Sequence, residues 1–193
     1  MIRLYAVLAA LLLLCLSPAI AQDTPPNAEK SKYTSIRLGL NFATIAGQDI
    51  AGTNWQPGAH AGVYLLTMET DKVGIQTEVQ YSLQGSEMER GHLLLHYITV
   101  PVTAKYFIEP NTSIQGGAYG ALLVSQKYEF EAFSNSPDLE GMDYGLAYGF
   151  SYGDESKYTV SLRHHLGLAN VLDKSVKAKN HTIQLSIAFC VSR

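Results

Sequence analysis

The sequence predicts an all-β fold, an eight-stranded antiparallel up-and-down transmembrane β-barrel. Three observations favour it. Apolar and polar residues alternate with period two in successive segments, and the connections between these segments alternate between long and short. One face of each segment carries bulky side chains, whereas the other carries mainly small polar ones. Together these features are typical of strands that expose one face to lipid and the other to a narrow interior.

The alternation is clearest in Val73–Gln84, where β-branched and large apolar residues occupy one parity and Gly, Gln, Glu and Ser occupy the other. Met142–Tyr152 and Ile183–Val191 repeat this pattern. Each of the segments has the length of about ten residues that a tilted membrane strand needs. The remaining strands are predicted from weaker alternation or from length alone, at Tyr33–Thr44, 58–68, His92–Phe107, 113–125 and Tyr158–Leu166.

The connections supply an independent argument. In an up-and-down meander every second connection lies at the same end, so alternating lengths place all long loops at one mouth and all tight turns at the other. The predicted long loops are Ile45–Gln56, Gly85–Gly91, Gln126–Gly141 and Leu168–Asn180, and the predicted short turns are Glu69–Lys72, Glu109–Asn111 and Gly153–Lys157.

The polar face distinguishes a membrane barrel from the alternative, a soluble lipocalin-like periplasmic binding barrel. A soluble barrel exposes its polar face to water, where Lys and Glu are frequent, but here that face is mostly small or uncharged. Charged residues are 16% of the chain, against about 25% in ordinary soluble domains. Aromatic girdles are expected at both membrane surfaces, from Tyr33, Tyr106, Tyr152, Tyr158 and Phe189 at the short turns and Phe42, Tyr81, Tyr97 and Tyr144 at the long loops.

The N-terminus predicts export. Arg3 precedes an apolar run, Leu4–Leu16, which is too short for a membrane-spanning helix, and Ala19-Ile20-Ala21 offers a small-x-small cleavage site. We therefore expect a cleaved signal peptide at 1–21, a flexible lead-in at 22–32, a barrel domain at 33–193 and a location in the bacterial outer membrane. Cleavage leaves Cys190 as the one cysteine, so no internal disulfide is possible.

Several stretches follow one another in a recognisable order and spacing: Gly39–Phe42, Val79–Gly85, Tyr97–Phe107, Gly116–Gly120, Asp143–Leu146 and Arg163–Leu168 followed by Asn170. They resemble the PorT-like family of Bacteroidetes-type outer-membrane β-barrel proteins, within the porin family. The resemblance implies an eight-stranded barrel in the outer membrane, in a family whose namesake is linked to a secretion and gliding apparatus. Two departures are His164, where the family usually has Tyr, and a C-terminus that does not end at an aromatic residue.

Charged residues with inward parity are expected to form a structural network, because an isolated buried charge is costly and eight strands leave room only for side chains. The alternative is an ion or proton path, or a small ligand site. An open aqueous pore would need about 16 strands. The residues concerned are Arg37, Glu78, Lys105, Asp143 and Arg163.

No cofactor, metal or catalytic site is predicted. His92 and His96 share a strand face but stand about 13 Å apart, and His164 and His165 point to opposite faces. The net charge of −3 without a basic run excludes nucleic acid as an expected partner. A lipid-modifying enzyme at the rim remains an alternative, and its residues would be His60, His165 and Ser161.

The long loops are the preferred site of function. Gln126–Gly141 places Tyr128, Phe130 and Phe133 among acidic residues, a composition suited to recognition. We expect a non-enzymatic, monomeric outer-membrane barrel that contacts lipid and serves as a structural element, an adhesin or an assembly partner in an envelope or secretion complex.

Overall fold

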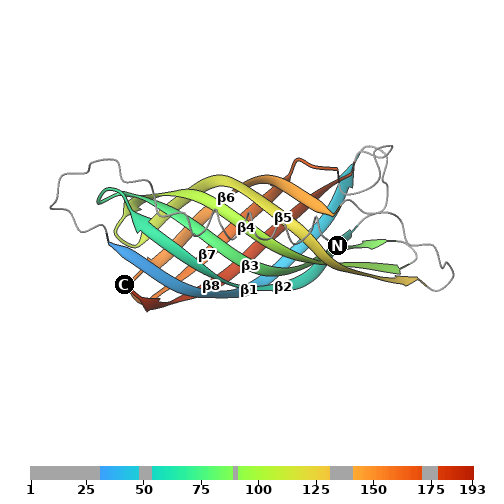
Figure 1. The fold of residues 1–193 in the computed structure, drawn as a ribbon, viewed down its shortest axis with the longest axis horizontal. Coiled ribbons are helices and arrows are strands. Elements are labelled where there is room, and N and C mark those ends of the chain that lie inside the picture. The colour runs from blue at the N-terminus through green and yellow to red at the C-terminus, as the bar shows by residue number, and fades with distance from the viewer. Residues whose placement is uncertain (1–30, 48–53, 89–90, 131–140, 171–177) are drawn as a thin grey trace, which may run out of the picture.

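The computed structural model describes residues 31–47, 54–88, 91–130, 141–170 and 178–193. They form a closed barrel in which each strand pairs antiparallel with its sequence neighbours and β1 pairs with β8 (Figure 1). The predicted fold class is confirmed. The strands are β1 (Lys32–Gly47), β2 (Asn54–Met68), β3 (Val73–Met88), β4 (Gly91–Glu109), β5 (Thr112–Phe130), β6 (Met142–Asp154), β7 (Tyr158–Gly167) and β8 (Ala178–Ser192).

All connections at one end are short, and three of the four at the other end are longer. One end, called the turn end below, carries the β2–β3, β4–β5 and β6–β7 turns together with the start of β1 and the end of β8. The other, the loop end, carries the remaining four connections. Residues 1–30, which include the predicted signal peptide and most of the lead-in, lie outside the described residues, and so does most of the predicted loop Gln126–Gly141.

The strands extend further at the loop end than the sequence predicted. The predicted long loop Gly85–Gly91 was wrong: β3 continues to Met88 and β4 begins at Gly91, so two residues connect them. β5 likewise continues to Phe130. Backbone pairing such as Ser86 with Leu93 holds these extensions. The sequence did not reveal these extensions, because backbone groups of two strands can pair without any alternation of apolar residues once the strands extend beyond the membrane.

Burial alternates along the strands as the predicted parity requires. In β6, Asp143 and Ala147 are buried whereas Tyr144 and Tyr148 are exposed, and the other strands repeat the pattern. The outer surface is therefore apolar and the interior largely polar, the inverse of a soluble domain. Among the residues described there is no helix long and apolar enough to cross a membrane.

The exposed aromatic residues gather near both ends, as the two girdles require. Two of the predicted members do not belong to them. Tyr97 is fully buried and points inward, because it shares the parity of Thr99 and Lys105. Tyr33 is half-buried and packs against an interior cluster at the turn end. The outward-facing members are Tyr106, Tyr152, Tyr158 and Phe189 towards the turns and Phe42, Tyr81 and Tyr144 towards the loops.

Candidate functional site in the barrel interior

Two arginines share one carboxylate in the middle of the barrel. Arg37 of β1 donates from Nη1 to Oε2 of Glu78 at 2.7 Å, and Arg163 of β7 donates from Nη2 to the same oxygen at 3.0 Å. Gln76, two residues before Glu78 on β3, donates to this oxygen as well, at 3.3 Å. The charged side chains are at most 1% exposed. A charged group that is buried this completely is stable only when other groups pair with it.

A second ion pair lies beside the first. Lys105 of β4 pairs with Glu155, which stands in the turn after β6. Tyr64 of β2 joins both pairs: its hydroxyl donates to Oε2 of Glu155 at 2.9 Å, and its ring lies 4.6 Å from the guanidinium carbon of Arg37. We call Arg37, Glu78, Lys105, Glu155 and Arg163 the charged centre.

The structure brings together four of the five predicted interior charges and separates the fifth. Asp143 lies nearer the loop end, where its Oδ2 accepts hydrogen bonds from the hydroxyl of Tyr119 at 3.0 Å and from Nδ2 of Asn180 at 3.4 Å. Parity fixes which way a side chain points, but the level along the barrel depends on the register with neighbouring strands. That register is not readable from one strand alone.

The sequence missed one member of the charged centre, Glu155, and also Tyr64, which contacts both ion pairs. Glu155 falls in a turn, where no parity applies, so no local signal marks it as interior. Tyr64 lies in the glycine-rich segment 58–68, whose alternation was ambiguous. The signal that was available for Tyr64 is its shared parity with His60 and Leu66, all of which are buried.

An ordered hydrogen-bond chain lies nearer the loop end. The amide nitrogen of Asn41 donates to the backbone oxygens of Ala59 and Leu83, which fixes the orientation of that amide. Its Oδ1 is therefore an acceptor for Nδ1 of His60 at 2.7 Å, and Nε2 of His60 accepts from the hydroxyl of Ser186 at 2.8 Å. The order serine, imidazole, amide is that of a nucleophile, its base and the group that orients the base.

Gly39 makes this chain possible. His60 belongs to β2 and Ser186 to β8, so the imidazole crosses β1, which lies between them. A Cβ at Gly39 would stand 2.5 Å from Cε1 of His60 and 2.2 Å from the backbone oxygen of Leu185. Both distances are far below van der Waals contact. Glycine is thus required here for a close approach and not for its backbone freedom.

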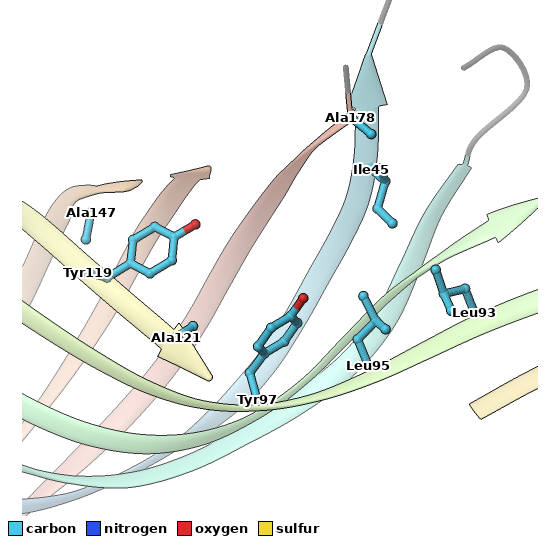
Figure 2. Close-up of a cluster of buried hydrophobic side chains, with 8 residues drawn as sticks. All are labelled: Ile45, Leu93, Leu95, Tyr97, Tyr119, Ala121, Ala147 and Ala178. Carbon is cyan, nitrogen blue, oxygen red and sulfur yellow. The ribbon is translucent and has the colours of Figure 1, made fainter. Parts of the chain in front are cut away.

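A cluster of apolar side chains lies in the interior at the loop end, beside polar ones such as Gln84 and Asn180. We call this cluster the apolar mouth. Its side chains project inward from five strands (Figure 2), and Tyr119 also stacks on His165 with ring centroids 4.8 Å apart. Its members are Ile45, Leu93, Leu95, Tyr97, Tyr119, Ala121, Ala147 and Ala178.

The residues considered for a rim enzyme do not assemble at the rim. His60 bonds to Asn41 and Ser186, whereas His165 stacks on Tyr119 and Ser161 is buried on β7. His164 faces outward and bonds to the hydroxyl of Tyr148 at 2.7 Å.

Within the part of the chain that the structure describes, no three His, Cys, Asp or Glu side chains are grouped to hold a metal ion. His96, one of the two histidines weighed as ligands, bonds to the hydroxyl of Tyr81 on the outer face.

The predicted recognition residues lie at the limit of the described structure. Tyr128 and Phe130 belong to the last residues of β5 and not to a loop, with backbone partners Leu93 and Gly91. Their side chains, and Phe133 altogether, lie outside the described residues. Just before them, residues 124–127 are exposed in succession, so the inward and outward alternation of β5 has ended. These four residues of β5 are therefore accessible on both faces of the strand.

Comparison with known proteins agrees with this geometry. Residues 20–173 match the family model described as "Outer membrane protein beta-barrel domain". The fold is similar to that of Neisserial surface protein A, at a TM-score of 0.60 and 9% identity over 82% of this chain and 98% of the other. It is also similar to that of Ail, the attachment invasion locus protein of Yersinia pestis, at a TM-score of 0.50 and 13% identity over 83% and 99%. A search of curated proteins found no match.

Proposed function

We propose that this chain acts through its extracellular loops as a structural element, an adhesin or an assembly partner in an envelope complex. The chain belongs to the outer membrane protein beta-barrel domain family, and this membership supports the proposal. The protein is a bacterial outer-membrane β-barrel. Its action on a partner, without enzymatic chemistry, is the part that we propose.

The observation that carries this proposal is the filled interior. Arg37, Tyr64 and Lys105 occupy the middle of the barrel, Leu95 and Tyr97 occupy the mouth, and each is at most 2% exposed. An eight-stranded barrel is just wide enough for such side chains to fill. A wide solute path through the described part of the interior is therefore blocked, and the surface available for function is that of the loops.

The β4–β5 hairpin supports a role outside the membrane. Each of these strands has 19 residues, whereas about 9 to 11 are enough to cross the hydrocarbon layer. The surplus lies at the loop end, where residues 125–127 are polar and exposed in succession. The hairpin thus extends beyond the length needed to cross the membrane, and Tyr128 and Phe130 belong to its last residues.

Three finer proposals rest on the sequence alone. The first is membership of the PorT-like branch, which favours an assembly partner in a secretion complex over an adhesin. The second is export with cleavage after Ala21, followed by the lead-in at 22–32. The third is a monomeric barrel.

Site-specific photo-crosslinking in native outer membranes tests the proposed role. A photoreactive amino acid at Lys127, which is exposed at the loop end, is compared with one at Lys157, which is exposed at the turn end. A discrete crosslinked protein from position 127 alone supports an assembly partner at the loops. Crosslinks from position 157 alone contradict the assignment to the loops. If neither position crosslinks, and purified barrels on beads bind no cells, the proposal fails.

A second candidate function rests on the Asn41–His60–Ser186 chain. With Nδ1 of His60 donating to Asn41, Nε2 accepts the hydrogen bond of the Ser186 hydroxyl, which is the arrangement of a serine nucleophile and its base. A small fluorophosphonate probe tests this function. Labelling of the wild type that Ser186→Ala abolishes and Ser161→Ala retains would favour a hydrolase, and an unlabelled protein would exclude it. Ser161 is the matched control because it is the backbone partner of Ser186 on β7 and is also buried.

A further inference from the structure

We infer that the charged centre binds one small inorganic anion, of the size of chloride, between the guanidinium groups of Arg37 and Arg163. The first reason is charge balance. Arg37, Arg163 and Lys105 bring three positive charges, whereas Glu78 and Glu155 bring two negative ones. One positive charge is left within the charged centre, and an uncompensated buried ion costs several kcal/mol.

Asp143 does not supply the missing charge. Its carboxylate is held towards the loop end by Tyr119 and Asn180, and no described cation pairs with it. The exposed pair of Lys157 and Asp154 stands outside the barrel interior and balances itself.

The second reason is a set of buried donors without partners. Nε and Nη2 of Arg37, and Nε and Nη1 of Arg163, have no hydrogen-bond partner among the described residues. Both side chains are 1% exposed. Buried donors are almost always satisfied, and those of a charged group are the most costly to leave open. A guanidinium group presents its donors in a fork that suits an anion.

The surroundings limit the ligand to a small anion. The ring of Tyr64 lies over Arg37, so an anion can approach that guanidinium only along its edge. Gln115 lies level with Arg163, since both pair with Gly149, which has no side chain, and its amide nitrogen is also without a partner among the described residues. Water molecules could satisfy the arginine donors but would leave the surplus positive charge of the charged centre uncompensated. A bulky organic anion would not fit among side chains that already fill the bore.

Chloride binding to the mature full-length barrel, folded in detergent, tests the inference. The thermal unfolding midpoint is measured while chloride replaces gluconate at constant ionic strength. In the wild type the midpoint should rise with chloride, because a ligand that binds only the folded state stabilises it by RT ln(1 + L/Kd), where L is the free chloride concentration. Equal midpoints in chloride and gluconate would overturn the inference.

Two variants change the charge of the site in opposite directions. Arg163→Gln makes the charged centre neutral. The rise of its unfolding midpoint with chloride, called the chloride response, should therefore be at least tenfold smaller than that of the wild type. Glu78→Gln leaves two uncompensated charges, so its chloride response should exceed that of the wild type. Lys157→Gln is the matched control, since it removes one positive charge outside the barrel and should respond like the wild type. Equal responses of Arg163→Gln and Lys157→Gln would show an adventitious ion only.

A bromide soak of wild-type crystals decides the question where a variant does not fold. Anomalous density within hydrogen-bonding distance of both Arg37 Nη2 and Arg163 Nη1 is expected. Bromide density elsewhere but not between these two groups, at saturating concentration, would overturn the assignment.

Discussion

The two halves of the barrel interior fill the same bore in different ways. Towards the turn end, ion pairs centred on Glu78 hold β1, β3 and β7 together. Towards the loop end, Leu93, Leu95 and Tyr97 fill the space with apolar packing. The charged centre is buried, and a low dielectric strengthens each of its ion pairs while raising the penalty for an unpaired charge. The two halves can therefore be tested separately.

The largest effect is expected from breaking the charged half. Glu78→Gln removes the carboxylate that both Arg37 and Arg163 use, and it should lower the free energy of unfolding by about 3–5 kcal/mol, the usual cost of breaking a buried ion pair. Urea unfolding followed by the fluorescence of Trp55, the one tryptophan of the chain, measures it. An effect below about 1 kcal/mol would mean that water reaches the charged centre.

Breaking the apolar half should cost somewhat less. Leu95→Ala opens a cavity in the apolar mouth and should lower the free energy of unfolding by about 2–4 kcal/mol. The neighbouring Leu94 faces outward and is only half-buried, so Leu94→Ala is the matched control and should cost clearly less. Equal costs for the two variants would show that the mouth is not packed as a core.

The boundary between the halves is tested at Gly39. Gly39→Ala forces a Cβ into the His60 ring and into the backbone of β8, so it should cost about 1–3 kcal/mol, as overpacking usually does. Gly120→Ala is the control, because a Cβ there meets no atom within 4 Å. A stable Gly39→Ala barrel would mean that His60 can leave Ser186 at little cost.

The smallest effect is expected outside both halves. Lys157 and Asp154 form an ion pair at 3.5 Å, with side chains that are 72% and 43% exposed. Lys157→Ala should change the free energy of unfolding by less than about 0.5 kcal/mol, since exposed pairs contribute little. A cost comparable to that of Glu78→Gln would remove the contrast between buried and exposed ion pairs on which the comparison depends.

The sequence predicted the strands well where lipid and interior impose opposite demands on alternate residues. Val73–Gln84 is such a case, and β3 begins at Val73 as expected. Prediction failed where those demands end. Residues 85–88 are paired in β3 and 126–130 in β5, yet the exposed run at 124–127 shows that alternation has ended in β5. Tyr97 was assigned to a girdle on its residue type, although its parity already pointed inward.

The sequence by itself determined the eight strands, their order and the inward direction of Arg37, Glu78, Lys105, Asp143 and Arg163, because period-two alternation is a local property of each strand. Only the tertiary structure decided which of these side chains meet. The stagger between strands separated Asp143 from the other four and brought Glu155 from a turn to Lys105. Contacts across a closed barrel depend on the register of all its strands together, and no single segment encodes that register.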